Sequence, residues 1–454
     1  MKIVLNSIVS VSLSVLMFFG FKKNQSATVK SNEFNSKSIS LNRSATANTQ
    51  DIITLANAFK ATLSASQITT LQLNYTLSNA ATWSNLPASM SPRLGIKMGT
   101  LTTTQRTAAN TLIQAMTGTP VGEGYNELQG LWAADDYLSA NGGGTNYGNG
   151  NFYIAFFGTP NLTGTFEIQM TGHHRTVANT YVDGNLVGAT PSFVATEPYA
   201  SFTSGGTTYK PMLEEKTALV NMLAGLTASQ LTAAHLTTTF SDIILGPQKD
   251  WIFPTTKIGL QVGTLTAAQK QLILNAIATY VNDVDDASAV SFMTQYTTDI
   301  DNTFIAYSGT ATLNNQNDYV RIDGPGVWIE YSTQNGIILS PKHPHSVWRD
   351  HTKDYGGTGA PLNTQGFSLI SKITNFPNPV QDNTTFNFTL KENAVVKIYL
   401  YDLKGRIIAN PYKNTLSSGN NSITVDLSNL SSGTYIYNIE SNGVKSNASK
   451  LVKK

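Results

Sequence analysis

Five of the six histidines in this 454-residue chain fall into two clusters, His173 with His174 and His343 with His345 and His351. A His-x-His segment such as 343–345 directs both imidazoles to one face when it is extended, because side chains alternate along a strand. With a third nitrogen from the first cluster, such a set could hold zinc, iron or manganese. His173, His174, His343 and His345 are therefore candidate metal ligands. Neighbouring residues on a strand point to opposite faces, so we expect only one ligand from the 173–174 pair.

Charged side chains around the second cluster are the candidate catalytic groups. Glu330 lies among apolar strand residues, where burial would raise its pKa as a general base requires; the alternative is that it faces water. Asp350 is a second candidate base. Arg349 could bind a carboxylate or phosphate, although a structural ion pair is its more usual role. Glu197, Glu330, Asp350 and Asp354 are also candidate carboxylate ligands beside the histidines.

These residues favour a metal-dependent hydrolase, in which a metal activates water and Glu330 or Asp350 accepts the proton. Two other interpretations remain open: a non-catalytic surface module that binds glycan or peptide, and histidines that only hold loops in place. The sequence carries no serine-nucleophile elbow, phosphate-binding glycine loop or dinucleotide fingerprint. It also has no cysteine, which excludes disulfides, thiol nucleophiles and cysteine-ligated zinc.

The charge distribution argues against a nucleic-acid partner. The formal net charge is +2, but residues 1–50 and 371–454 are basic and the segment between them is acidic. Phosphate binding requires a basic footprint, which the centre of the chain lacks. We expect no nucleic acid and no nucleotide as partner, and an extracellular substrate that the sequence does not identify.

An internal repeat predicts the elements that position these residues. Gly95–Gln105 recurs as Gly259–Gln269, and Leu63–Gln67 recurs as Leu226–Gln230. Each longer copy runs into an apolar-periodic helix. Thr102 and the equivalent threonine at 266 precede a glutamine by three positions, which is the pattern of a helix-capping box.

A similar strand segment follows each helical region, at residues 152–159 and 303–310, and a pair of further strands follows each of those. We therefore expect an α+β core over residues 51–356, duplicated as a helix-then-β-meander in halves of about 51–200 and 211–356 that face one another. Gly172-His173-His174 aligns with Gly324-Pro325-Gly326, and Pro191-Ser192-Phe193 aligns with His343-Pro344-His345. Because the histidines lie where the copies differ, we expect a His-lined site between the halves.

The N-terminus predicts export. One basic residue, an apolar run from Ile8 to Phe21 and a polar exit fit a signal peptide over residues 1–26, followed by a flexible linker at 27–50. The apolar run is shorter than the about 20 residues that span a bilayer, although a retained anchor is the alternative. A second linker is expected at 357–370.

The tail, residues 371–454, alternates apolar and polar residues between glycine-containing turns, which predicts a small all-β, Ig-like sandwich. Its motifs are Phe376-Pro377-Asn378-Pro379, Val396-Lys397-Ile398-Tyr399, Tyr401-Asp402-Leu403-Lys404-Gly405-Arg406, Leu430-Ser431-Ser432-Gly433-Thr434-Tyr435 and the closing Lys450-Leu451-Val452-Lys453-Lys454. In their residues and in their order along the chain, these motifs resemble the type A sorting domain of type IX secretion (the Por secretion tail). The resemblance implies passage through the periplasm to the cell surface or medium, with the type IX machinery as partner.

The central motifs also resemble a known family. They are Trp83-Ser84-Asn85-Leu86-Pro87, Gly172-His173-His174, Pro191-Ser192-Phe193, Arg321-Ile322-Asp323-Gly324-Pro325, Trp328-Ile329-Glu330-Tyr331, the run from His343 to Asp350, and Asp354-Tyr355-Gly356. Together they resemble domain-of-unknown-function family 3500 over residues 51–356, a resemblance that implies no activity. Ala195 departs from the pattern, which has glycine there, and we expect that change to affect only loop geometry.

Overall fold

A computed structural model of the chain describes residues 48–454 except 340–341, 360–369, 391–392, 403–404, 442–443 and 447. The expected signal peptide and nearly all of the linker at 27–50 lie outside the described residues, as does most of the linker at 357–370. In the part of the chain that is described, no helix is long and apolar enough to cross a membrane.

Helices precede strands twice in the core. The α-helices are α1 (Thr49–Ala61), α2 (Ala65–Leu71), α3 (Leu77–Ala80), α4 (Thr103–Ala115), α5 (Gly124–Leu138), α6 (Leu213–Ala224), α7 (Ala228–Ala234), α8 (Ala267–Val281) and α9 (Asp286–Thr298). The capping boxes expected at the start of α4 and α8 are confirmed. In each, the threonine side chain accepts from the backbone N–H of the glutamine three positions on, and the glutamine side chain accepts from the backbone N–H of the threonine.

Strands of the core belong to one large sheet, apart from a separate hairpin. They are β1 (Gln72–Leu73), β2 (Ile96–Lys97), β3 (Tyr153–Phe157), β4 (Thr165–Gly172), β5 (Arg175–Val182), β6 (Asn185–Gly188), β7 (Ser192–Ala195), β10 (Leu260–Gln261), β11 (Phe304–Ser308), β12 (Tyr319–Asp323), β13 (Val327–Asn335) and β14 (Lys342–Asp350). The hairpin is β8 (Phe202–Ser204) with β9 (Thr207–Tyr209). The main strand order is β1-β3-β4-β5-β7-β14-β13-β12-β11-β10, with β2 on β3 and β6 on β5.

The seam of this sheet joins β7 to β14. They pair antiparallel from Ser192 opposite Trp348 to Ala195 opposite His345. We expected two facing units, but the strands of 51–200 and 211–356 instead meet edge to edge. This arrangement gives the backbone groups of both edges hydrogen-bond partners, which exposed edges lack. The seam is also where the two histidine clusters meet.

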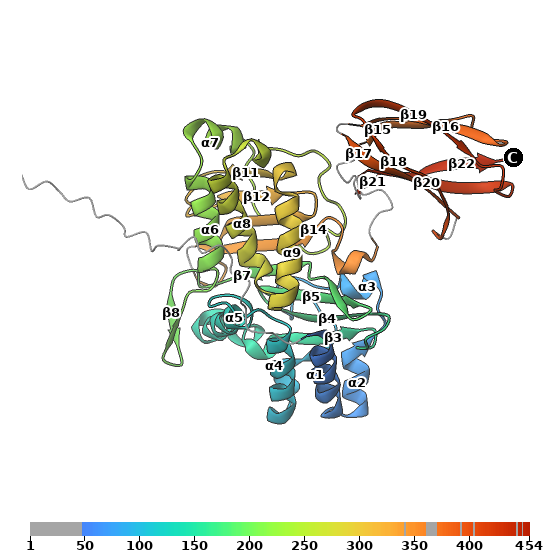
Figure 1. The fold of residues 1–454 in the computed structure, drawn as a ribbon. Helices are drawn as coiled ribbons and strands as arrows, with labels where there is room; N and C mark the ends of the chain where they lie inside the picture. The colour runs from blue at the N-terminus through green and yellow to red at the C-terminus, as the bar shows by residue number, and fades with distance from the viewer. Residues whose placement is uncertain are drawn as a thin grey trace, which may run out of the picture. The chain divides into compact units, whose positions relative to one another are not determined.

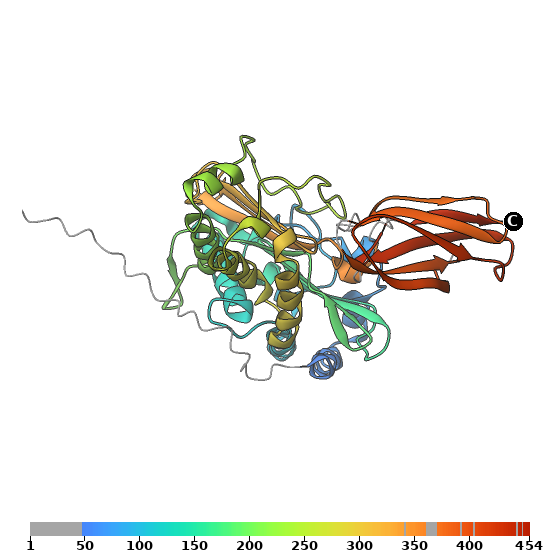
Figure 2. The ribbon, with the colours of Figure 1, turned by 45° about the horizontal axis from the view of Figure 1, so that its top comes forward.

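Helices cover one face of the sheet (Figures 1 and 2). One apolar cluster joins α1, α4 and α5 to β3–β5, and another joins α6, α8 and α9 to β11–β14 and includes Trp348. The neighbouring Val347 points to the opposite face, because side chains alternate along a strand. There it packs with Trp83 and Phe193. Loops and the short helix α3, which contributes Ala80 to this cluster, therefore cover the face that carries His345.

Residues 370–454 form an all-β region, as the alternation predicted. One sheet holds β15 (Ile370–Phe376), β16 (Asn383–Leu390) and β19 (Gly419–Asp426). The other holds β17 (Ala394–Tyr401), β18 (Ile407–Leu416), β20 (Gly433–Ser441), β21 (Val444–Lys445) and β22 (Ser449–Lys453). Phe386 of the first sheet and Ile398 and Ile439 of the second share one apolar core.

Candidate metal centre

His343 and His345 lie near the start of β14, on its loop-covered face. The alternation of an extended strand places both imidazoles on that face, as the His-x-His spacing predicted. Their side chains are buried, and their Nε2 atoms lie 2.9 Å apart. Two ligands held about 2.05 Å from one ion lie about 2.9 Å apart at a bond angle of about 90° and about 3.3 Å apart at the tetrahedral angle, so a tetrahedral ion would require the two imidazoles to separate by about 0.4 Å. The same separation also fits an N–H···N hydrogen bond.

His174 reaches these two residues from the turn between β4 and β5. It has φ of 64°, in the left-handed region, so the strand alternation expected for His173 and His174 does not apply. Their rings stack instead, with centroids 3.6 Å apart. The His174 backbone N–H donates to the carbonyl of Asn85, and its carbonyl accepts from Ala195 of β7.

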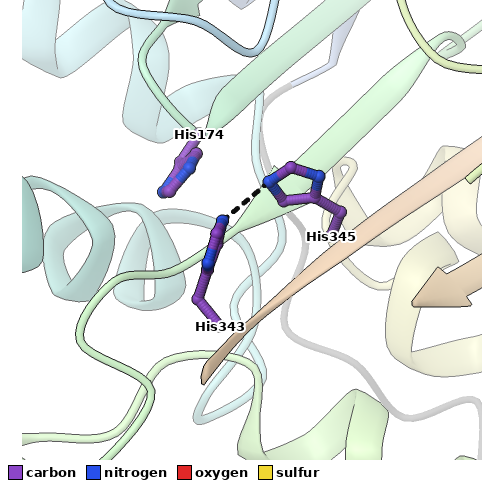
Figure 3. Close-up of side chains that lie close together, drawn as sticks. All are labelled: His174, His343 and His345. Carbon is purple, nitrogen blue, oxygen red and sulfur yellow. Dashed lines mark hydrogen bonds between the residues drawn. The ribbon is translucent and has the colours of Figure 1, made fainter. Parts of the chain in front are cut away.

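The three imidazoles of His174, His343 and His345 converge. One ring nitrogen from each lies within 4.8 Å of the others, and all three residues are buried (Figure 3). Ala195 is opposite His345 across the seam and hydrogen-bonds to His174, so it lies between β14 and the turn that carries His174. His173 is not part of this three-nitrogen group.

Two aspartates contact the Nδ1 atoms of His345 and His173. Both carboxylate oxygens of Asp242 lie 3.0–3.1 Å from Nδ1 of His345. Asp135 of α5 lies 2.5 Å from Nδ1 of His173. A carboxylate on one ring nitrogen fixes the tautomer and leaves the other nitrogen able to bind a metal. Sequence reasoning missed both aspartates, because neither lies near a histidine in the chain.

Burial keeps two of the three imidazoles neutral. Desolvation, reinforced by the neighbouring histidines, lowers the pKa of His174 well below its usual 6.5. The same causes lower the pKa of His343 to about 3. Neutral imidazole is the form that binds metals, so neither ring has to lose a proton before it can act as a ligand at neutral pH.

Glu330, expected as a general base, has a different environment. Its Oε1 accepts from Tyr319 Oη and the Ile244 backbone, and its Oε2 accepts from Trp328 Nε1 and the Leu245 backbone. The residue is fully buried. Four donors occupy both oxygens, so Glu330 anchors the loop of residues 236–258, which we call the strap.

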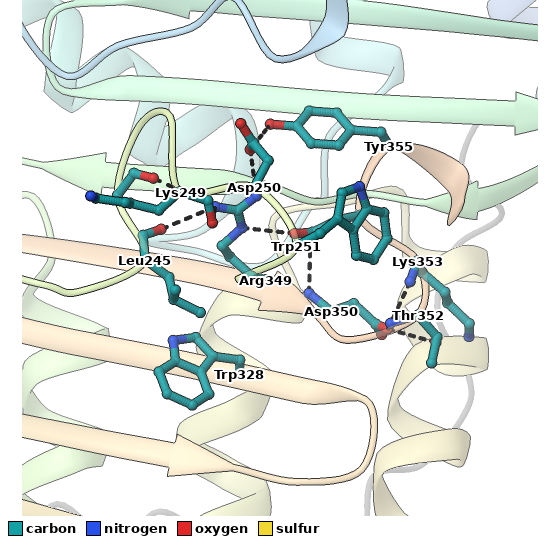
Figure 4. Close-up of polar contacts among 12 residues, drawn as sticks. Leu245, Lys249, Asp250, Trp251, Trp328, Arg349, Asp350, Thr352, Lys353 and Tyr355 are labelled. Carbon is teal, nitrogen blue, oxygen red and sulfur yellow. Dashed lines mark hydrogen bonds and ion pairs between the residues drawn. The ribbon is translucent and has the colours of Figure 1, made fainter. Parts of the chain in front are cut away.

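Arg349 also binds the strap (Figure 4). It pairs with Asp250 and with Asp354 at 2.7 Å each, and its Nη1 donates to backbone carbonyls of the strap such as that of Leu245. This is the structural ion pair that was the alternative for Arg349. Asp354, a candidate ligand, is occupied by this pair and by the Asp350 backbone.

Asp350 and Glu197 hold other parts of the chain. Asp350 Oδ1 accepts from the backbones of Thr352 and Lys353, and its Oδ2 accepts from Tyr296. Glu197 accepts from the backbones of residues 338 and 339 in the β13–β14 loop. In the described residues, no hydrogen bond or ion pair joins these carboxylates, Glu330 or Arg349 to the three histidines.

The family comparison bears on the whole core. Residues 45–357 match the family model described as Protein of unknown function (DUF3500). The chain belongs to this family. All three convergent histidines lie inside the DUF3500 region, and both resemblances that the sequence predicted are confirmed.

Residues 374–454 of this DUF3500 chain match the secretion system C-terminal sorting domain. The chain is therefore a type IX secretion cargo, delivered to the cell surface or the extracellular space, and its partner in export is the type IX machinery. No curated protein matches the chain significantly. Among solved structures it is similar to dimeric latent PorU from Porphyromonas gingivalis, with 19% identity and a TM-score of 0.17. The match covers 32% of this chain and 14% of that one.

Proposed function

We propose that this exported protein is a metal-dependent hydrolase whose metal is held by His174, His343 and His345. The observation that carries the proposal is the convergence of three buried ring nitrogens within 4.8 Å. Three protein ligands leave one position of a tetrahedral ion open, which is the arrangement of catalytic rather than structural zinc sites.

The ligand chemistry favours zinc. Imidazole suits zinc, copper, iron and nickel, whereas manganese prefers oxygen ligands. Three imidazoles without a carboxylate therefore suit manganese less well than the set of histidines plus a carboxylate that the sequence suggested. A zinc ion lowers the pKa of a bound water to about 7, which supplies a nucleophile at neutral pH. Asp242 would orient His345 and raise its basicity as a ligand.

A signal peptide and an internal duplication are consistent with this proposal. We infer a signal peptide at residues 1–26 from its apolar run, and a duplication of 51–200 as 211–356. The duplication is supported by the same helix-then-strand order on each side and by the strand order β3-β4-β5-β7 running toward β14-β13-β12-β11. The metal would then bind between the two copies.

Hydrolysis of a panel of model peptides, esters, phosphoesters and glycosides tests the proposal. We expect the full chain to cleave at least one class, to lose that activity on chelation and to regain it with zinc. His345→Ala should remain inactive after zinc is added, whereas His235→Ala, a change at an exposed histidine on the end of α7, should not alter activity. Activity that survives both chelation and His345→Ala would contradict the proposal.

A further inference from the structure

A second polar cluster lies on the same loop-covered face, where residues from both ends of the strap contact it. Arg321 of β12 is opposite Glu330 of β13 in the sheet, and Asp323 follows two residues later on the same face. From the strap, Phe240, Phe253 and Lys257 contact this group.

Arg321 is buried but uses little of its hydrogen-bonding capacity. Only 3% of the residue is exposed. Its guanidinium carbon lies 4.6 Å from the centre of the Trp328 ring and 5.7 Å from that of Phe240. Its Nε donates to Tyr319 Oη at 2.8 Å. A guanidinium has five N–H donors, and among the described residues only the Nε donor of Arg321 has a hydrogen-bond acceptor. The two terminal nitrogens are not among the fully buried atoms that lack a partner, so they are accessible to solvent and to a ligand.

Asp323 offers an unused acceptor beside these unused donors. Its Oδ1 faces His351 Nε2 at 3.1 Å and Lys257 Nζ. Its Oδ2 is buried and has no hydrogen-bond partner in the described part of the chain. A buried carboxylate oxygen without a donor is unfavourable. A donor is therefore missing at Asp323, next to an arginine whose terminal nitrogens can still bind an anion.

Aromatic rings complete the surroundings. Phe253 lies against His351 with ring centroids 4.2 Å apart and meets the Trp328 ring edge to face. Phe240 stacks on Tyr319 at 4.0 Å. Phe240 and Phe253 are only partly buried, whereas Trp328 is fully buried. The cluster thus combines a cation, a hydrogen-bond acceptor and apolar ring surfaces.

We propose that this cluster binds a uronate, the carboxylate-bearing sugar unit of an acidic glycan. The sugar carboxylate would accept from the terminal nitrogens of Arg321, whose planar fork matches two carboxylate oxygens. A ring hydroxyl would donate to Asp323 Oδ2, and the C–H face of the sugar would pack on the aromatic rings. A neutral sugar leaves the guanidinium without an anion, and a simple carboxylate leaves Asp323 Oδ2 without a donor.

The position of the site connects it with the metal centre without depending on it. Arg321 and His345 are separated by two strand spacings and two residues along β14, which gives about 12 Å between their Cα atoms from sheet geometry. A glycan of a few units could therefore occupy both places. Because uronate recognition uses none of the three histidines, it should persist in metal-free protein.

Binding to the full chain, kept free of metal by chelation, tests the proposal by titration with D-glucuronate, D-glucose and acetate. We expect glucuronate to bind in about the millimolar range, and the other two at least about tenfold more weakly. Equal binding of acetate would overturn the assignment to a sugar, and equal binding of glucose would overturn the role of the carboxylate. If none of the three binds, the site itself is wrong, whatever the metal analysis gives.

Arg321→Lys keeps the charge but removes the planar fork, so it should weaken glucuronate binding about tenfold or more. Arg106→Lys is the matched control, because Arg106 contacts Asn149 in a separate part of the core. Circular dichroism verifies that each variant folds. If Arg321→Lys does not fold, competition of methyl glucuronate ester against glucuronate on the wild type replaces it, and the ester should fail to compete.

Discussion

At the scale of single residues, Ala195 places a small side chain beside the histidines. Its methyl group lies on the same face as His345, since the two are direct partners across the seam. Glycine, which the family pattern has here, would leave slightly more space. The departure thus falls in a strand beside the candidate metal centre and not in a loop.

Replacing Ala195 tests this packing. We expect Ala195→Gly to keep zinc affinity within a few-fold and Ala195→Leu to lower it at least about tenfold, because the larger side chain would push the imidazoles apart. Titration of zinc into metal-free protein measures both, with circular dichroism to verify folding. Unchanged affinity in a folded Ala195→Leu protein would show that the three nitrogens do not need this space.

Asp242 provides a second test of the ligand geometry. Asp242→Asn should weaken zinc binding about 10- to 100-fold, because the amide no longer fixes His345 as a carboxylate does. Asp301→Asn, at an exposed aspartate paired with Lys270, is the control and should leave affinity unchanged. Equal zinc affinities of the two variants would show that Asp242 does not position His345 as a ligand.

Glu167 predicts a pH dependence of stability. Burial raises its pKa from 4.5 to about 7, although Thr180 and Gln169 donate hydrogen bonds to it. The folded state therefore holds the proton more tightly than the unfolded state. Ionising Glu167 therefore costs the folded state more than the unfolded state. The resulting loss of folding stability is absent below pH 4.5, grows as the pH rises to 7 and then amounts to about 3 kcal/mol. Glu167→Gln should gain stability relative to wild type over that range in urea unfolding. A difference that does not vary between pH 4.5 and 7 would contradict this.

At the scale of elements, the strap is held by Glu330 and Arg349, two of the three residues that the sequence indicated as catalytic candidates. Glu330 and Arg349 bind its backbone at residues 244–250, and Asp242 at its start reaches His345. A buried charged residue that only holds a loop and one that takes part in catalysis look alike in a sequence, because both occur among the apolar residues of a strand. The contacts that distinguish the two come from a loop about 90 to 100 positions away in the chain, which no local pattern contains.

Glu330→Gln separates a structural role from a catalytic one. The amide nitrogen would face two N–H or O–H donors, so we expect a loss of about 3 kcal/mol in unfolding free energy and faster proteolysis of the strap. A matched substitution, Glu440→Gln, lies in the β-domain and should not affect strap proteolysis. Unchanged stability with loss of hydrolysis would restore Glu330 as a base.

Local patterns predicted the local parts of the site and fold. The capping boxes, the shared face of His343 and His345, and the alternating strands of the tail each depend on residues within a few positions of one another. The left-handed turn at His174 and the joining of β7 to β14 depend on tertiary contacts, such as those to Asn85 and Ala195. These features therefore could not be predicted from spacing alone.

At the scale of the whole molecule, the C-terminal sorting domain determines where the chemistry takes place. Deleting residues 374–454 should leave the protein inside the cell envelope, since the sorting domain directs passage across the outer membrane. Immunoblots of cell, surface and medium fractions measure this, with the full chain as control. Surface or medium levels equal to those of the full chain would contradict the prediction.

The central claim is that the three histidines hold a metal, and elemental analysis of the full-length protein, purified without chelator, tests it most directly. We expect about one zinc or similar transition-metal ion per chain in wild type and in His235→Ala, and almost none in folded His345→Ala. Wild-type protein without stoichiometric metal, or His345→Ala with as much metal as wild type, would contradict the claim. The 2.9 Å contact between His343 and His345 would then be a hydrogen bond.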